Sequence, residues 1–157
     1  MAGAIERFVE AARLLGVEPD VRRFPEGTKT AEDAAAAIGC DVAQIVKSLV
    51  FMADDRPVLA LTSGGNRVDT ARLAEVTGAA TVRRATPDEA RLATGYAVGG
   101  TPPFAHQERI RTFVDPDLLR FGEVWAAAGT PDAVFRLAPK DLVSASGATD
   151  AAFTEPR

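Results

Sequence analysis

Gln44-Ile-Val-Lys-Ser-Leu-Val-Phe-Met52 and Pro57-Val-Leu-Ala-Leu-Thr62 dominate the hydrophobic pattern of the chain. Both are rich in β-branched and apolar residues over the length of a buried strand, which favours strand over helix. Ala53-Asp-Asp-Arg56 lies between them and has the composition of a tight turn. We therefore expect an antiparallel hairpin at the centre of a sheet.

Helices and shorter strands are predicted on both sides of this hairpin. Capping residues define the helix ends: Thr30, Asp41 and Thr86 are suited to begin helical turns, and Gly16 and Gly39 to end them. The expected helices are 5–15, 30–39, one from Asp69 or Thr70 to Gly78, one from Thr86 and one from Pro139. The expected further strands are 21–24, 80–84, 110–114, 123–127 and 133–137, and 149–157 is expected to be a loose tail.

The chain has 157 residues, of which 46% are hydrophobic and 25% charged, as in one globular domain with a real core. The element order predicts an α+β fold spanning 1–157: a single domain with a mixed, mostly antiparallel sheet, curled or partly closed into a barrel, and helices outside. Neither a signal peptide nor a membrane span is found, so we expect a soluble, cytoplasmic protein without a membrane partner.

The counts of reactive residues exclude several functional classes. One cysteine, Cys40, and one histidine, His106, cannot form a disulfide or the usual zinc sets, so no metal or cofactor is expected. Gly-x-Ser-x-Gly and glycine-rich phosphate motifs are missing. A Cys40–His106 pair is less favoured than a structural cysteine.

The net charge of −4 argues against a general nucleic-acid coat protein, and no DNA partner is expected. Local basic spots could still contact a ligand, although short charge pairs are more often a solvated face. The candidates are Arg22-Arg23 with Lys29, Arg83-Arg84, and Arg109 with Arg111.

The loop Gly95-Tyr-Ala-Val-Gly-Gly-Thr-Pro-Pro-Phe-Ala-His106 is expected to be stiff, since two prolines follow two glycines. Prolines lack an N–H, which leaves the free amides of Val98 to Thr101 to converge on one oxygen atom. Such a loop can form a backbone oxyanion site. A rigid surface turn without chemistry explains the same residues equally well.

Lys47 interrupts the apolar run of the first central strand. A lysine is rarely buried without a partner, so it must reach solvent, pair with a carboxylate or face a polar cleft. An outward-pointing lysine at the start of a strand is the commoner case, and the residues alone leave these alternatives open.

Four strings in order resemble the YbaK/EbsC-type aminoacyl-tRNA deacylases, relatives of the editing insertion domain of bacterial prolyl-tRNA synthetase. They are Lys47-Ser-Leu-Val-Phe, Gly95-Tyr-x-x-Gly-Gly-Thr-Pro-Pro, Val124-Trp-Ala-Ala-Ala-Gly129 and Leu137-Ala-Pro-Lys-Asp-Leu142. The similarity covers about 5–148. It implies a free-standing trans-editing enzyme that hydrolyses mischarged tRNA, with tRNA for proline carrying cysteine or alanine as the substrate and prolyl-tRNA synthetase as a candidate partner.

The resemblance also implies the site. Lys47 matches the family lysine near the 3′ end of the tRNA, and Gly99, Gly100 and Thr101 match the loop beside the aminoacyl ester. Phe24, Pro102 and His106 are the expected substrate-binding residues. The chain departs from some members, because Ala126 to Ala128 contain no serine, Val134 stands near a family aspartate, and Ala105 replaces a usual glycine.

The expected chemistry needs no protein nucleophile, since an activated ester requires a positioned water, an oxyanion site and a proton acceptor. The acceptor could be the ribose hydroxyl, a main-chain carbonyl or His106. Two other functions remain open at this stage. One is a catalytically silent module that binds a tRNA end or a synthetase, and the other is a hydrolase of small aminoacyl esters.

Overall fold

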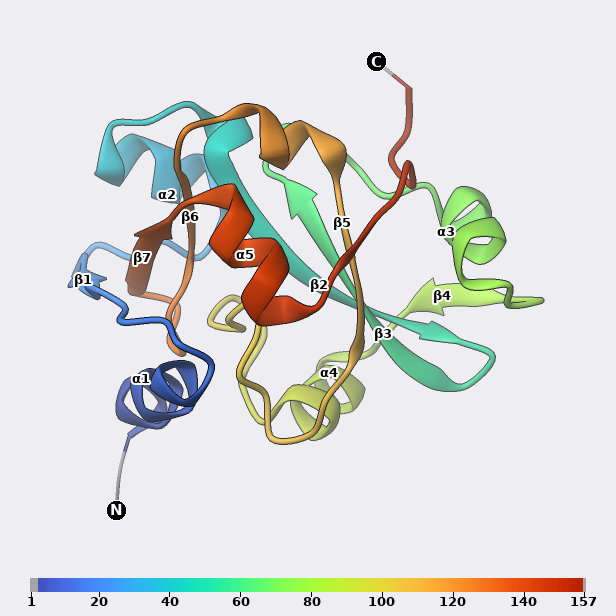
Figure 1. Cartoon of the computed structure of the whole chain (residues 1–157), viewed down its shortest axis with the longest axis horizontal. Helices are drawn as coiled ribbons and strands as arrows, with labels where there is room; N and C mark the ends of the chain where they lie inside the picture. Colours follow the sequence, from blue (N-terminus) through green and yellow to red (C-terminus); the bar gives the residue numbers. More distant parts are fainter. Residues whose placement is uncertain (1–2, 157) are drawn as a thin grey trace.

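The computed structural model describes residues 3–156, which form five helices and eight strands (Figure 1). The helices are α1 (Ala4–Leu14), α2 (Ala31–Ile38), α3 (Thr70–Thr77), α4 (Pro87–Thr94) and α5 (Pro139–Ser146), with 3₁₀ turns η1 (Val42–Gln44) and η2 (Pro116–Arg120). The strands are β1 (Arg22–Arg23), β2 (Ile45–Ala53), β3 (Arg56–Ser63), β4 (Val82–Arg84), β5 (Arg111–Val114), β6 (Val124–Ala127), β7 (Ala133–Leu137) and β8 (Thr149–Asp150).

The β2–β3 hairpin is the centre of the sheet, as predicted. Its strands pair antiparallel from Val46 opposite Ser63 to Ala53 opposite Arg56. Asp54 and Asp55 both have positive φ, 47° and 66°, which is the backbone that a two-residue turn between twisted strands requires. Figure 1 shows the hairpin as a long twisted ribbon across the molecule.

All strands join one mixed, open sheet in the order β1-β7-β6-β2-β3-β5-β8, with β4 also paired to β2. β6 runs parallel to β2, and β5 runs parallel to β3. β4 pairs antiparallel with the far end of β2. The α+β fold is therefore confirmed, and the sheet does not close into a barrel.

The predicted caps begin the helices. The Thr30 hydroxyl accepts a hydrogen bond from Asp33 N at 3.0 Å, and Asp69, not Thr70, caps α3. Asp41 caps η1, and Thr86 caps α4 with proline at the first helical position. Local sequence thus determines where the chain turns on each side of the hairpin.

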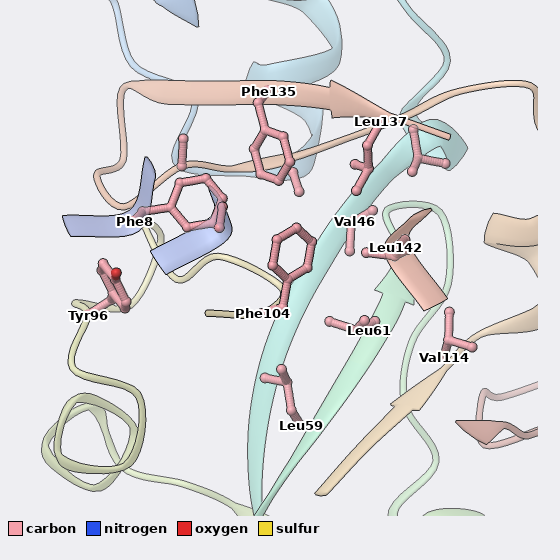
Figure 2. Packing of buried hydrophobic residues seen from close by; sticks show 14 of the residues in the cluster. Phe8, Val46, Leu59, Leu61, Tyr96, Phe104, Val114, Phe135, Leu137 and Leu142 are labelled. Carbon is pink, nitrogen blue, oxygen red and sulfur yellow. The ribbon is translucent and has the colours of Figure 1, made fainter. Parts of the chain in front are cut away.

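Three phenylalanines hold α1 and the glycine-rich loop against the sheet (Figure 2). The ring of Phe8 on α1 lies 5.9 Å from that of Phe104 and 5.0 Å from that of Phe135 on β7. Phe104 is 2% exposed, so the loop is anchored in the core at this point. Burial of each aromatic side chain contributes about 1.5–3 kcal/mol.

The expectation of a loose C-terminal tail is wrong. Thr149–Asp150 forms β8 beside β5, and Phe153 is fully buried in a second apolar cluster. Thr154 pairs with Val68, and Asp69 N donates to Phe153 O at 2.8 Å. One buried aromatic residue and these backbone bonds fix a segment whose composition resembles a tail.

No helix within residues 3–156 has the length and apolar character needed to cross a bilayer.

Candidate functional site

A cleft of about 600 Å³ lies along one edge of β2. It is bounded by the 28–30 segment and α2, by β6 and β7, by the end of β4 with the start of α4, and by the glycine-rich loop. Most of the residues that line it are apolar, and six of them are alanine. The wall residues include Ala31, Ala34, Ile45, Val50, Ala85, Ala90, Trp125, Ala126 and Val134.

The cleft exists because β2 has strand partners at both ends of this edge but not in the middle. β6 pairs with Ile45 and Val46, and β4 pairs with 51–53. On this edge no described residue pairs its backbone with 47–49, and these residues line the cleft. The floor of the site is therefore an unpaired stretch of sheet edge.

Lys47 extends from this stretch and is held by a neutral group. Its Nζ donates to the main-chain oxygen of Asn66 at 2.6 Å. Asn66 Nδ2 in turn donates to the carboxylates of Asp115, at 2.9 Å, and Asp117, at 2.8 Å. Because the ammonium contacts a carbonyl rather than a carboxylate, it is oriented without being neutralised and can still attract an anion.

Burial lowers the pKa of Lys47, and the positive charges of Arg84 and Arg67 lower it further. The carboxylates of Glu32 and Asp115 act in the opposite direction and raise this pKa. The alternative of an outward-pointing, fully solvated lysine does not describe this environment. Such a partly desolvated cation in a cleft is typical of a functional site.

Two further cations line the cleft with Lys47, namely Lys29 and Arg84. The Arg84 guanidinium lies 5.7 Å from the centre of the Phe51 ring. Arg83 instead pairs with Glu89 at 2.7 Å outside the cleft lining. Glu32 is the one carboxylate in the lining, so three cations outnumber it; in a chain of net charge −4, this excess marks a place suited to a negatively charged ligand.

The glycine-rich loop is only partly in the cleft. Gly99 and Thr101 line it, and Gly99 has a φ of +92°, which favours glycine. The Gly100 N–H donates to Ala97 O at 3.0 Å, and the Thr101 hydroxyl donates to the same oxygen at 3.2 Å. The expectation of a free amide at Gly100 is therefore wrong.

Glycine is required at position 100 because the chain packs closely there, and not because a ligand must approach it. A Cβ at this position would lie 2.7 Å from Thr130 Cα, and Gly129 N donates to Gly100 O at 3.0 Å. The close approach is thus to the chain after β6.

The three residues expected to bind substrate lie outside the lining of the cleft. Phe24 packs against the apolar cluster that includes Trp125 and Val134, and Pro102 is buried. His106 lines a separate hollow of about 380 Å³ with Arg109. The structure therefore groups Lys47 with Gly99 and Thr101 and separates His106 from them.

The ring of His106 contacts a main-chain oxygen of the glycine-rich loop. Its Nε2 lies 2.7 Å from Pro102 O, and since a carbonyl only accepts, Nε2 carries the proton. Burial lowers the pKa of His106, which favours the neutral ring. Its contact supports the shape of the loop.

No group of three or more His, Cys, Asp or Glu side chains within residues 3–156 is placed to hold a metal ion.

Sequence reasoning missed Ser48, Asn66 and Asp115. Ser48 Oγ is buried without a hydrogen-bond partner among the described residues. Asp115 is 1% exposed and also accepts from Ser63 N at 3.0 Å. These roles depend on strand pairing between distant segments, and the sequence carries no local signal for them.

The profile of the aminoacyl-tRNA editing domain family matches residues 25–145, a range that includes all the residues lining the cleft. The chain belongs to the aminoacyl-tRNA editing domain family.

Members and relatives of the editing domain family resemble the whole chain or a large part of it. A solved structure described as a candidate trans-editing enzyme for prolyl tRNA synthetase is 41% identical, with a TM-score of 0.93 over 99% of each chain. The uncharacterised protein YwhH of Bacillus subtilis is 32% identical over 126 residues, 80% of each chain. The proline–tRNA ligase of Streptococcus thermophilus is 32% identical over 112 residues, which are 71% of this chain but 18% of the ligase. The similarity predicted from the four sequence strings is thus confirmed.

Proposed function

We propose that this editing domain is a free-standing trans-editing hydrolase that cleaves the ester between amino acid and tRNA. The proposed substrate is tRNA for proline carrying a small wrong amino acid such as cysteine or alanine. The observation that carries the proposal is the ammonium of Lys47, which is held at 2.6 Å by the Asn66 carbonyl beside a cleft with a largely apolar lining. Membership of the editing family indicates the class of ligand.

The cations have separate tasks in this proposal. Lys47 lies on the strand that forms the cleft floor and binds the terminal phosphate or the ester region as a point charge. Lys29 and Arg84 line the same cleft and attract the phosphates of the preceding nucleotides. A tRNA end supplies several negative charges along one strand, which a small neutral ester does not.

The reaction is hydrolysis without a covalent enzyme intermediate. A water oxygen attacks the ester carbonyl carbon, the bond from that carbon to the ribose oxygen breaks, and the ribose oxygen takes a proton as the hydroxyl of the released tRNA. The attacking water passes its proton to the neighbouring ribose hydroxyl, which gives its own proton to the leaving ribose oxygen. Alternatively, a main-chain carbonyl accepts a hydrogen bond from the water and orients it while the proton of the water moves to the leaving oxygen. His106, the third candidate acceptor, lines another hollow.

The small apolar wall accounts for selection of the amino acid by size. One methylene in an apolar pocket changes binding by about 1–3 kcal/mol, so the cleft should exclude large side chains by contact and discriminate weakly among small ones. Alanine residues 31, 34, 85, 90 and 126 give this wall its shape. Proline, the correct amino acid, would be rejected by size or by its ring.

A panel of aminoacyl-tRNAs tests the proposed function. The protein should accelerate amino-acid release from tRNA carrying small amino acids, with mischarged tRNA for proline preferred over the same amino acid on another tRNA. The matched control is the minimal aminoacyl-adenosine. Equal acceleration of the minimal ester would favour a small-ester hydrolase, and binding without release would favour a silent module.

A further inference from the structure

The unpaired edge of β2 has two backbone groups aimed into the cleft. Gly64 N donates to Ile45 O at 2.8 Å, so the odd-numbered residues of β2 direct their N–H and C=O groups towards β3. The even-numbered residues direct theirs to the opposite edge. Ala85 N donates to Val50 O at 3.1 Å on that edge, in agreement with this pattern. The N–H and C=O of Ser48 therefore face the cleft.

Neighbouring strands do not reach Ser48. The β6 ladder ends at Val46 opposite Ala126, and the β4 ladder begins at Phe51 opposite Arg84. Among the described residues, no strand supplies a partner for the N–H and C=O of Ser48. Backbone N–H and C=O groups of a strand are nearly always paired inside a fold. Ser48 is half-buried in the lining of the cleft, so its unpaired N–H and C=O offer two hydrogen bonds to a ligand that completes the ladder.

We propose that the aminoacyl group of the substrate docks on Ser48 as an antiparallel strand of one residue. Its α-amine donates to Ser48 O, and its ester carbonyl oxygen accepts from Ser48 N–H. Only antiparallel pairing lets one residue exchange both bonds with a single partner residue. This inference rests on the proposed function, and it names the atoms that recognise the substrate.

Antiparallel docking also sets the direction of the rest of the substrate. The ester oxygen and ribose then run towards the N-terminal end of β2 and lie next to Lys47. The amino-acid side chain lies on the face of the even-numbered residues, where Val46, Val50, Ala85 and Ala126 belong to one apolar cluster. One orientation thus places the phosphate near the cation and the small side chain near the small wall.

The Ser48 amide also supplies the oxyanion contact that the Gly100 amide cannot. Negative charge develops on the ester carbonyl oxygen when water attacks, and an N–H already aimed at that oxygen stabilises the charge. The Gly100 N–H is occupied by Ala97 O. The main-chain N–H of Ser48 is therefore a catalytic group in this proposal, whereas its side chain is not required.

Replacing Ser48 by its α-hydroxy analogue tests the amide, because this change substitutes an ester oxygen for the N–H. The expected loss of deacylation rate is about 10²–10³-fold. The thermal midpoint should change little, since this N–H belongs to no described ladder.

The same replacement at Met52 is the matched control. Met52 directs its N–H to the same edge but lies opposite Arg83 in the β4 ladder. Its α-hydroxy analogue should lower the thermal midpoint and leave the deacylation rate of the folded protein unchanged. An unchanged rate for the analogue at Ser48, or equal rate losses at both positions, would overturn the inference.

The second arm of the test changes the substrate instead of the protein. The best aminoacyl-tRNA of the panel is compared with its desamino analogue, and each enzymatic rate is divided by the uncatalysed rate of the same ester. Loss of the amine leaves Ser48 O without its donor, so the acceleration should fall about tenfold. Equal acceleration would refute amine recognition. Turnover of the panel by the unmodified protein with no effect in either arm would reject this inference alone and leave the proposed function standing.

Discussion

The glycine-rich loop and the middle of β2 both offer backbone hydrogen bonds, but they use them differently. In the loop, the Gly100 N–H is occupied by Ala97 O and its carbonyl by Gly129 N, so the loop stabilises itself and its neighbour. On β2, the edge at Ser48 stays unpaired between two short strands. A segment rich in glycine and proline is thus a wall of the site, whereas an ordinary strand supplies its floor.

Gly100→Val should give the largest effect and test the loop half of this comparison. A Cβ would lie 2.7 Å from Thr130 Cα, 2.8 Å from Thr130 C and 2.9 Å from Gly129 O, and these main-chain atoms cannot move alone. We expect a loss of about 3 kcal/mol or more in the free energy of unfolding. Thermal and denaturant unfolding measure it.

Gly122→Ala is the control for this prediction, because no atom lies within 4 Å of the added Cβ. Its stability should change by less than about 1 kcal/mol. A Gly100→Val protein of normal stability that is inactive would contradict the packing role and return Gly100 to the catalytic site.

Lys47→Ala should affect the rate rather than the fold. Removing the cation that holds phosphate or ester is expected to reduce deacylation at least about tenfold, equivalent to about 1.4 kcal/mol. Lys47→Arg should also be impaired, because the planar guanidinium does not fit a contact of 2.6 Å to the Asn66 carbonyl in the same way. Single-turnover rates with matched thermal midpoints measure both. Normal turnover by Lys47→Ala would remove the proposed site.

Arg84→Ala and Arg83→Ala are a smaller, paired test of the cleft charges. Arg84 lines the cleft, whereas Arg83 pairs with Glu89. Arg84→Ala should weaken kcat/KM several-fold and reduce the slope of its logarithm against the logarithm of salt concentration by about 0.7, the value for one phosphate contact on a single strand. Arg83→Ala should leave this slope unchanged. Equal effects of the two variants would mean that the position of Arg84 in the cleft gives it no special part in substrate binding.

His106→Asn should have the smallest effect on the reaction, because His106 lines the separate hollow. A measurable fraction of the rate should remain, with the acidic limb of the pH–rate profile retained. Loss of about 10²-fold together with that limb would make His106 a general base.

The pH dependence of stability gives His106 a separate measurement. Burial lowers its pKa in the folded state, so the unfolded chain binds the proton more readily. The stability that comes from the neutral ring is complete above the unfolded pKa of about 6.5. It is lost as the pH falls from there through the lower pKa of the folded state. His106→Asn should therefore show a weaker decline of thermal midpoint below pH 6.5 than the unmodified chain.

Local patterns predicted the parts of the fold that local chemistry determines. The hairpin, its two-residue turn and the caps at Thr30 and Thr86 follow from residues close in sequence. The tail was mispredicted because the burial of Phe153 depends on a cluster with distant residues such as Leu73 and Phe113. Composition alone cannot show that a single aromatic side chain will be buried against residues distant in sequence.

Only part of the site could be predicted, because only part of it depends on local sequence. Lys47 is visible as a charge in an apolar run, and the pair Arg83-Arg84 is visible as a basic spot. Which arginine enters the cleft depends on the alternation of β4 and its register with β2. The open position at Ser48 depends on where two other strands stop, and the hydrogen bond at Gly100 depends on how its loop folds back. These are long-range outcomes of packing.

The most direct test of the β2 site is an amide chemical-shift titration with a non-hydrolysable 3′-aminoacylamino-adenosine. The ligand carries the amine, the carbonyl and the nucleoside but cannot be cleaved. We expect the largest shifts at 47–50 and 99–101, with the Ser48 amide proton moving downfield, and little change at 104–109 or 144–147. Shifts centred on the hollow of His106, or no shift at Ser48 when the ligand is saturating, would contradict it.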